Sequence, residues 1–251
     1  MRLSSARGYT LLEVLIVSSL LAGILLLTLD FMSRATDKVM QVTEEAFLQS
    51  QVQHMVETIS SVIQESSSSL VTLYRWTDPP GGKIELTDGS LIDSTQVAIC
   101  FATPRNIAGD FVFTTGSGSN LTITSEPVWQ GICVFAYYEE ALYLYADYNA
   151  HTYDHLNPIY ITGIYANTIT LSDGTIFNRG GPAQANQTIK KVMANLAQLE
   201  IPNYTSGIYA DTHPMEISLT AQTKLHGATF SRQYQMITAT MITDVLTRNK
   251  N

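Results

Sequence analysis

The chain has 251 residues, of which 45% are apolar, and its formal net charge at neutral pH is −8. That length is enough for one sizeable core, or for one core and a small subdomain. The 14 lysines and arginines form no run longer than Lys190-Lys191. Nucleic-acid binding needs a basic stripe, so we expect no nucleic-acid partner.

The N-terminus combines a short basic leader with a long apolar run. Residues 1–8 contain Arg2 and Arg7, and the 21 residues from Tyr9 to Leu29 contain one charged residue, Glu13. A basic leader before an apolar helix stays on the cytoplasmic side, and about 20 apolar residues span a bilayer. We therefore expect a single-pass protein whose partner is the lipid bilayer and whose remaining chain lies outside the cytoplasm.

Two simple explanations of this run leave Glu13 unexplained. A cleaved secretory signal would have an apolar region of about 7 to 15 residues and then a small-x-small site, but this run is longer and no clean site follows it. A plain signal anchor fits the length. However, an ionised carboxylate at bilayer depth costs ~2.5 kcal/mol or more, so an anchor alone would favour leucine at this position.

The segment RGYTLLEVLIV, residues 7–17, resembles the signature of type IV prepilins, which is found in type IV pilins and in the pseudopilins of type II secretion. In that family a basic leader ends in glycine, a large apolar residue follows, and glutamate is the fifth residue after the cut. Gly8, Tyr9 and Glu13 match these positions, although tyrosine is less usual than phenylalanine there. The resemblance implies cleavage after Gly8 by prepilin peptidase and N-methylation of Tyr9.

The same resemblance implies a role for Glu13 in filament assembly. Its carboxylate would pair with the terminal amine of a neighbouring subunit and so specify register, because an unpaired buried charge costs several kcal/mol. The implied partners are other pilin or pseudopilin subunits, the prepilin peptidase and the inner-membrane assembly platform. In the alternative interpretation, Glu13 only reaches back to the cytoplasmic interface.

Beyond the apolar run, the sequence predicts that the helix continues to about Glu65. Apolar residues recur every three to four positions, which is typical of an amphipathic helix. They fall in two sets, Phe31, Ala35, Val39, Val42 and Ala46, and then Val52, Met55, Val56, Ile59, Val62 and Ile63. A continuous helix from Tyr9 to Glu65 would be about 85 Å long at ~1.5 Å per residue.

From Val71 onward the apolar period changes to two, which predicts an antiparallel β-rich head. Asp88-Gly89 and Asp173-Gly174 lie between short alternating runs and each predict a hairpin. Short aromatic and β-branched segments predict further strands. These are residues 96–102, 110–115, 120–125, 131–140 and 141–148.

Both cysteines, Cys100 and Cys133, lie in predicted strands. Outside the cytoplasm a disulfide between non-neighbouring strands is favoured, and the chain-entropy model assigns it roughly 3 to 4 kcal/mol. The alternative is two buried free thiols.

The C-terminal third carries a second, looser resemblance. Residues 180–204 predict a short helix that runs into a strand. Within them, KKVMANLAQLEI resembles a late segment of the larger minor pseudopilins of the J or W type. The closing residues Arg232, Tyr234, Arg248 and Asn249 resemble the final strand of that subfamily.

Catalytic and cofactor motifs are not recognisable in the sequence. His151 and His155 are spaced for a metal only if they lie on a helix, and the Tyr-, Asn- and Pro-rich surroundings predict a loop instead. We therefore expect no enzyme, no metal and no cofactor. The tyrosine-rich stretch from Tyr137 to Tyr165 is either a sheet face or a binding surface.

Taken together, these features predict an α+β fold in which a long N-terminal helix packs against an antiparallel head, as in the lollipop-shaped pilins. The expected division is a leader at 1–8, a membrane or filament-core half-helix at 9–30, an amphipathic half-helix at 31–69 and a head at 70–251. The expected function is that of a minor pilin or pseudopilin. The alternatives are a signal-anchored binding module or pilus-tip adhesin, and an anchored enzyme.

Overall fold

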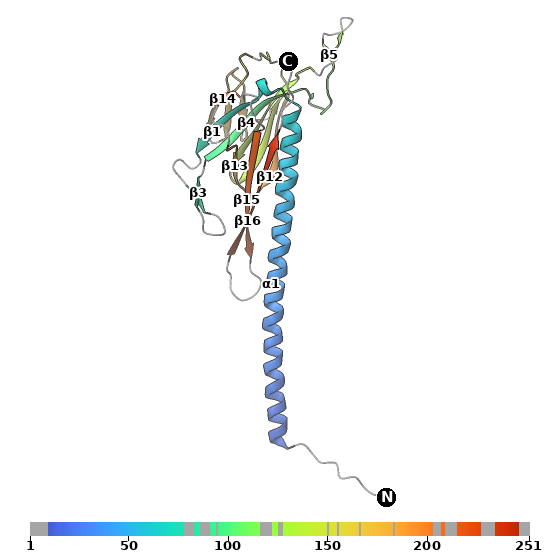
Figure 1. The fold of residues 1–251 in the computed structure, drawn as a ribbon, viewed down its shortest axis with the longest axis vertical. Helices are drawn as coiled ribbons and strands as arrows, with labels where there is room; N and C mark the ends of the chain where they lie inside the picture. Colours follow the sequence, from blue (N-terminus) through green and yellow to red (C-terminus); the bar gives the residue numbers. More distant parts are fainter. Residues whose placement is uncertain are drawn as a thin grey trace. The chain divides into compact units, whose positions relative to one another are not determined.

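The computed structural model describes residues 10–77, 83–85, 91–93, 95–115, 122–124, 128–149, 151–154, 156–165, 167–182, 184–202, 207–208, 215–226 and 234–245. The chain divides into two compact units. One comprises residues 1–44 and 224–235, and the other comprises residues 45–223 and 236–251. The predicted α+β class is confirmed, because a long N-terminal helix precedes antiparallel sheets (Figure 1).

Helix α1 runs from Leu11 to Gln64 without a break. Its 54 residues contain no proline, and they extend about 80 Å at ~1.5 Å per residue. It ends in a serine-rich run, where the amides of Glu65 and Ser66 bond to carbonyls three residues back, and a short 3₁₀ helix, η1, follows at Ser68–Leu70. The predicted span of residues 9–65 is therefore confirmed over the described helix.

The two apolar sets on α1 have different surroundings. In the second set Val52, Met55, Val56, Ile59 and Ile63 are buried, together with Leu48. In the first set Phe31, Val39 and Val42 are more than half exposed. The C-terminal part of the helix, from about Leu48, thus contributes directly to the core of the head.

The main sheet of the head has six strands in the order β12-β8-β7-β4-β1-β14, and each of its strand pairs is antiparallel. In chain order the strands are β1 (Thr72–Thr77), β4 (Thr95–Thr103), β7 (Gly131–Tyr138), β8 (Ala141–Asp147), β12 (Gln187–Ala194) and β14 (Gly207–Ile208). The strands predicted at 96–102, 131–140 and 141–148 are confirmed as β4, β7 and β8.

Smaller antiparallel sheets complete the described part of the head. One has the order β11-β10-β9, and another has the order β13-β15-β16. Their strands are β9 (Ile161–Tyr165), β10 (Thr168–Leu171), β11 (Ile176–Asn178), β13 (Leu196–Glu200), β15 (Met215–His226) and β16 (Tyr234–Val245). Two ribbons pair β2 (Lys83–Glu85) with β3 (Leu91–Asp93), and β5 (Thr114–Thr115) with β6 (Thr122–Ile123).

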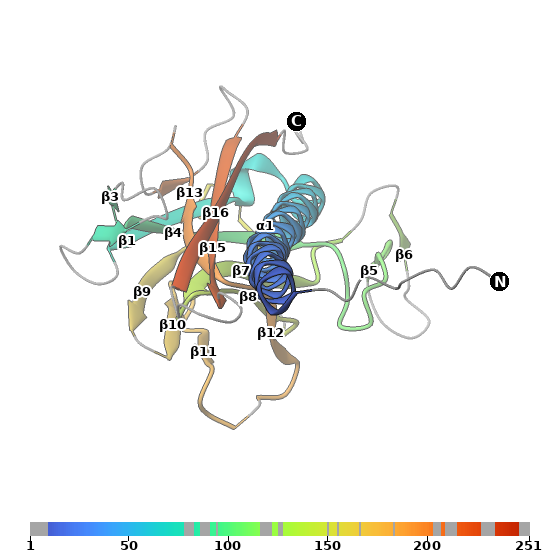
Figure 2. The same cartoon turned by 90° about the horizontal axis from the view of Figure 1, so that it is seen from below.

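The main sheet is buried on both faces. On one face, residues of β4, β7 and β8 pack with β9, β10 and β11 in a cluster that includes Ala98, Cys100, Ile132, Val134, Ile161, Ile169 and Phe177. On the other face, Phe101 and Phe135 are fully buried and stack with ring centroids 5.7 Å apart. The head part of α1 and strand β13 lie beside the sheet (Figure 2).

The hairpin predicted at Asp173-Gly174 is confirmed by the pairing of β10 with β11. Only the glycine takes a positive φ, of 89°, and its amide bonds to the carbonyl of Leu171 at 3.1 Å. The turn is therefore centred on Ser172 and Asp173, with Gly174 as the left-handed residue that follows it. Strands β2 and β3 flank the other predicted turn, but Asp88-Gly89 itself lies outside the described residues.

Two sequence-based predictions in the head are wrong. Residues 110–113 are not a strand, apart from an isolated bridge between Arg105 and Phe111. The helix predicted within 180–204 is replaced by β12 and β13, which are separated by Asn195 with φ 59°. The helical spacing of Val192, Leu196 and Leu199 arises because the chain passes from one sheet to another at that residue.

Candidate functional site

The N-terminus of α1 is closed by a reciprocal pair of hydrogen bonds between Thr10 and Glu13. The Thr10 amide donates to Glu13 Oε2 at 2.8 Å, and the Glu13 amide donates to Thr10 Oγ1 at 3.3 Å. The Thr10 hydroxyl also donates to Oε2 at 3.1 Å. This is a capping box, which satisfies amides that have no partner within the helix and places a carboxylate at its positive end.

The sequence carried a signal for this arrangement that the motif analysis missed. TLLE, residues 10–13, has the spacing of a Thr cap and a Glu three positions later. The bonds that Thr10 donates both end on Oε2, so Oε1 accepts none from the described residues. Gly8 and Tyr9, the residues of the expected cleavage and methylation, lie outside the described residues.

The first part of α1 is apolar on all sides. The helix is long and apolar enough to cross a membrane, and its large apolar side chains from Leu11 to Leu29 are exposed. The hydroxyls of Ser18, Ser19 and Thr28 donate to carbonyls of their own helix at 2.8 to 3.0 Å. These three hydroxyls therefore need no partner outside the helix, as a bilayer requires.

The other end of α1 is fixed to the head by Arg105. Its guanidinium donates from Nε and Nη2 to the two carboxylate oxygens of Glu65, at 2.8 and 2.6 Å. Nη1 donates to the carbonyl of Gly109 at 2.7 Å, and the guanidinium lies 4.0 Å from the centre of the Phe111 ring. The bond to Glu65 raises the pKa of Arg105. Forty residues separate the two partners, so no local pattern indicated this contact.

The structure contradicts the expected disulfide between Cys100 and Cys133. Strands β4 and β7 are direct neighbours, and Cys100 lies opposite Val134 while Cys133 lies opposite Phe101. Because side chains alternate along a strand, this one-residue offset places the two sulfurs on opposite faces of the sheet. Both thiols are free and buried, and burial raises the pKa of Cys100 to about 12 and also raises that of Cys133.

The tyrosine-rich stretch is mostly part of the head's packing. Tyr145 is buried, and Arg179 lies over the rings of Tyr138 and Tyr143 at 3.1 and 5.0 Å from their centroids. Tyr160 and Tyr165 are exposed. The interpretation as a sheet face therefore holds for most of these residues.

His151 lies in a loop, as the surrounding composition predicted, and its side chain is only 4% exposed. Its ring faces Asp173 on one side and Asp147 on the other. His155, its expected companion in a metal site, lies outside the described residues. Asp147 lies four residues before His151 and Asp173 lies 22 residues after it, and no local motif indicated that both carboxylates face the ring.

No family model matches this chain, and no curated protein or solved structure shows a significant match to it.

Proposed function

We propose that this chain is a minor pilin or pseudopilin, a structural subunit without enzymatic activity. Prepilin peptidase cuts the leader after Gly8, and Tyr9 becomes the methylated N-terminus. The first part of α1 then holds the subunit in the cytoplasmic membrane, with the head outside, until it enters a type IV pilus or a type II secretion pseudopilus. One observation carries the proposal: a single carboxylate, Glu13, in the first turn of an exposed apolar helix, five residues after the leader glycine.

The geometry of Glu13 supports its use in assembly. Within one subunit the capping box holds the carboxylate at the helix end through Oε2. The other oxygen, Oε1, is then available to a cation from a neighbouring subunit, and cleavage before Tyr9 creates such a cation, the α-amine. In an apolar bundle each of these charges needs the other, because an unpaired buried charge costs several kcal/mol.

The first experiment determines the N-terminal residue and the intact mass of the protein taken from its native membrane, with and without the peptidase. A peptidase-dependent start at methylated Tyr9 is expected. A start at Met1 in both strains would refute the proposal, and Glu13 would then serve only as a helix cap.

A second experiment separates the two uses of Glu13. Glu13→Gln keeps a side chain that can serve in a capping box but removes the charge, whereas Thr10→Val removes the cap hydroxyl and keeps the charge. Loss of a cap costs about 1 kcal/mol, which a long helix tolerates. We expect Glu13→Gln to block entry into filaments while membrane insertion stays normal, and Thr10→Val to assemble. The reverse order would show that capping is what matters.

A signal-anchored binding module or tip adhesin is the second candidate, and the exposed rings of Tyr160 and Tyr165 are the observation that favours it. Such a protein needs its anchor but not its carboxylate. Normal surface display and target binding by a Glu13→Ala variant would support this candidate over a filament subunit.

A further inference from the structure

Asp147, His151 and Asp173 form a cluster in the head that the proposed assembly function does not use. His151 Nδ1 lies 2.8 Å from Asp173 Oδ2, and Nε2 lies 3.6 Å from Asp147 Oδ1. The side chains of His151 and Asp147 are only 4% and 3% exposed. A largely buried imidazole therefore lies between a buried carboxylate, that of Asp147, and a partly exposed one, that of Asp173, whose side chain is 25% exposed.

Both carboxylates already accept hydrogen bonds from other groups. Asp147 Oδ1 accepts from the amide and the side chain of Asn149 at 2.8 and 2.6 Å, and Oδ2 accepts from Gln187 at 2.7 Å. Asp173 accepts from the amide and the hydroxyl of Thr175, both at 3.0 Å. In each of these bonds the aspartate oxygen is the acceptor, which is the role of a carboxylate.

That arrangement determines which form of His151 fits. If Nδ1 carries the only ring proton and donates it to Asp173, then the lone pair of Nε2 faces a carboxylate oxygen in a buried site. Nε2 has no hydrogen-bond partner among the described residues. The doubly protonated ring avoids this repulsion, because both nitrogens then carry protons and face a negative charge.

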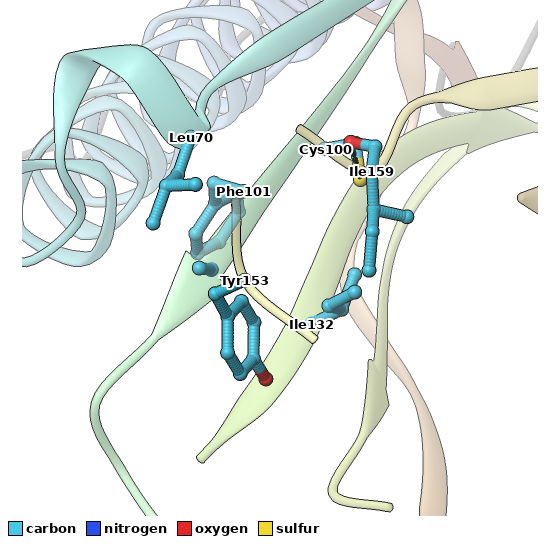
Figure 3. Close-up of a pocket in the computed structure, with 7 residues that line it drawn as sticks. Leu70, Cys100, Phe101, Ile132, Tyr153 and Ile159 are labelled. Atoms are coloured by element: carbon cyan, nitrogen blue, oxygen red, sulfur yellow. Dashed lines mark hydrogen bonds between the residues drawn. The ribbon is translucent and has the colours of Figure 1, made fainter. Parts of the chain in front are cut away.

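The cluster joins separate parts of the head. Asp147 ends β8, and Asp173 lies in the turn between β10 and β11. His151 belongs to the segment whose Tyr153 and Ile159 pack against the core cluster on the Cys100 face of the main sheet. Within that segment the Ile159 carbonyl accepts from Thr72 at 3.1 Å and from the Cys100 thiol at 3.7 Å. Figure 3 shows Ile159 beside Cys100, and Tyr153 beside Phe101 at the same pocket.

We propose that His151, when protonated, stabilises the packing of its segment and of the β9–β11 sheet on the main sheet. As an imidazolium it ties this segment to β8 and to the β10–β11 turn, and so holds the β9–β11 sheet against the main sheet. Loss of the proton removes the attraction to Asp147 and leaves two acceptors facing each other. The head is therefore more stable to unfolding in mildly acidic than in alkaline solution.

The other titratable groups near the ring do not replace it in this role. From its own segment comes Tyr153, and from β4 comes Cys100. Burial raises the pKa of both, so each stays neutral over the range in which imidazole titrates. Among the side-chain types of this cluster, imidazole is the one whose charge ordinarily changes between about pH 5 and 8.

The test uses the full chain in detergent and follows its unfolding in urea at pH 6 and pH 8. We expect the unfolding equilibrium constant of the wild type to rise about tenfold from pH 6 to 8 relative to His151→Gln, the size of one charge-assisted hydrogen bond. His54→Gln is the matched control, since His54 is exposed on α1, and it should follow the wild type. Parallel profiles for wild type and His151→Gln would overturn the proposal.

A second variant and a direct readout cover the case in which His151→Gln does not fold. Asp173→Asn still accepts from Nδ1 but removes one negative charge, and it should flatten the pH dependence. In the wild type, side-chain ¹⁵N resonances of His151 should show both nitrogens protonated at pH 6. A singly protonated ring at pH 6 would refute the proposal. So would a loss of stability on adding EDTA, which would show that a metal ion rather than a proton lies between Nε2 and Asp147.

Discussion

Replacing Ile59 with alanine should destabilise the head without affecting the N-terminal part of the helix. Ile59 is fully buried on the stripe that the end of α1 presents to the head. The substitution removes three methyl or methylene groups, each worth ~0.8 kcal/mol of transfer free energy, and it leaves a cavity behind. We therefore expect the free energy of unfolding to fall by about 3 to 4 kcal/mol.

The assay is urea unfolding of the full chain in detergent, followed by tryptophan fluorescence. The chain has two tryptophans, Trp76 and Trp129, and both lie in the head, so an apolar helix that stays folded in the micelle adds no signal. With a slope of about 2 kcal/mol per molar urea, the midpoint should fall by roughly 1.5 to 2 M.

Val42→Ala is the matched control, because Val42 lies on the same helix but is 62% exposed. It should leave the midpoint within about 0.3 M, since exposed substitutions usually change stability by less than about 0.5 kcal/mol. Equal midpoints for the two variants would refute the reasoning, because the end of α1 would then contribute nothing to the core of the head.

Three further predictions follow from the head. Maleimide should label neither Cys100 nor Cys133 in the folded protein and should label both in the urea-unfolded protein. A variant with both cysteines replaced by alanine should fold without oxidising machinery. A disulfide in the purified protein would contradict the register of β4 and β7. Gly131→Ala should destabilise strongly, because a Cβ there would lie 2.7 Å from the carbonyl oxygen of Asp147, whereas Gly23→Ala, with open space around it, should not; thermal unfolding of both variants decides. Burial raises the pKa of Tyr145 to about 12 from an ordinary value near 10. Because the unfolded state loses this proton first, the free energy of unfolding should fall as pH rises above 10. Tyr145→Phe should lose less stability than the wild type between pH 9 and 11, and an equal loss would show that Tyr145 is not responsible.

Local patterns in the sequence predicted the elements that depend on local chemistry. The uninterrupted apolar spacing predicted α1 within two residues, and alternation predicted β4, β7 and β8. The same method failed at residues 180–204. There the side-chain spacing reflects a change of sheet at Asn195, and nothing in a run of residues distinguishes that from a helical period.

The candidate site was predictable only where it is continuous in sequence. Glu13 stood out because a charge in an apolar run is costly, although its partner Thr10 was overlooked. Contacts such as Arg105 with Glu65 and His151 with Asp173 join distant segments and left no local trace. The prediction of a disulfide failed for a further reason. A shift of one residue in strand pairing moves a side chain to the opposite face, and the sequence of two strands does not specify that register.

The two apolar sets on α1 lie on different sides of the helix. At about 100° per residue, the buried set centred on Ile59 and the exposed set from Phe31 to Ala46 are separated by roughly 120° around the axis. The span from Leu11 to Leu29 rises about 29 Å, which alone fills the hydrocarbon core of a bilayer. Neither contact with lipid nor packing in the core of the head therefore explains why the exposed set is apolar. An exposed apolar surface of that kind is typical of a protein contact.

This separation gives a test of the filament proposal that does not involve Glu13. Val42→Asp places a charge on the exposed set, where it should leave the urea midpoint of the head unchanged and yet prevent incorporation into filaments. Asp37→Glu, which preserves the charge of the same helix segment, is the control and should assemble. Filaments that accept Val42→Asp at the wild-type level would show that this stripe contacts no neighbour, and an anchored binding module would then explain the chain better than a filament subunit.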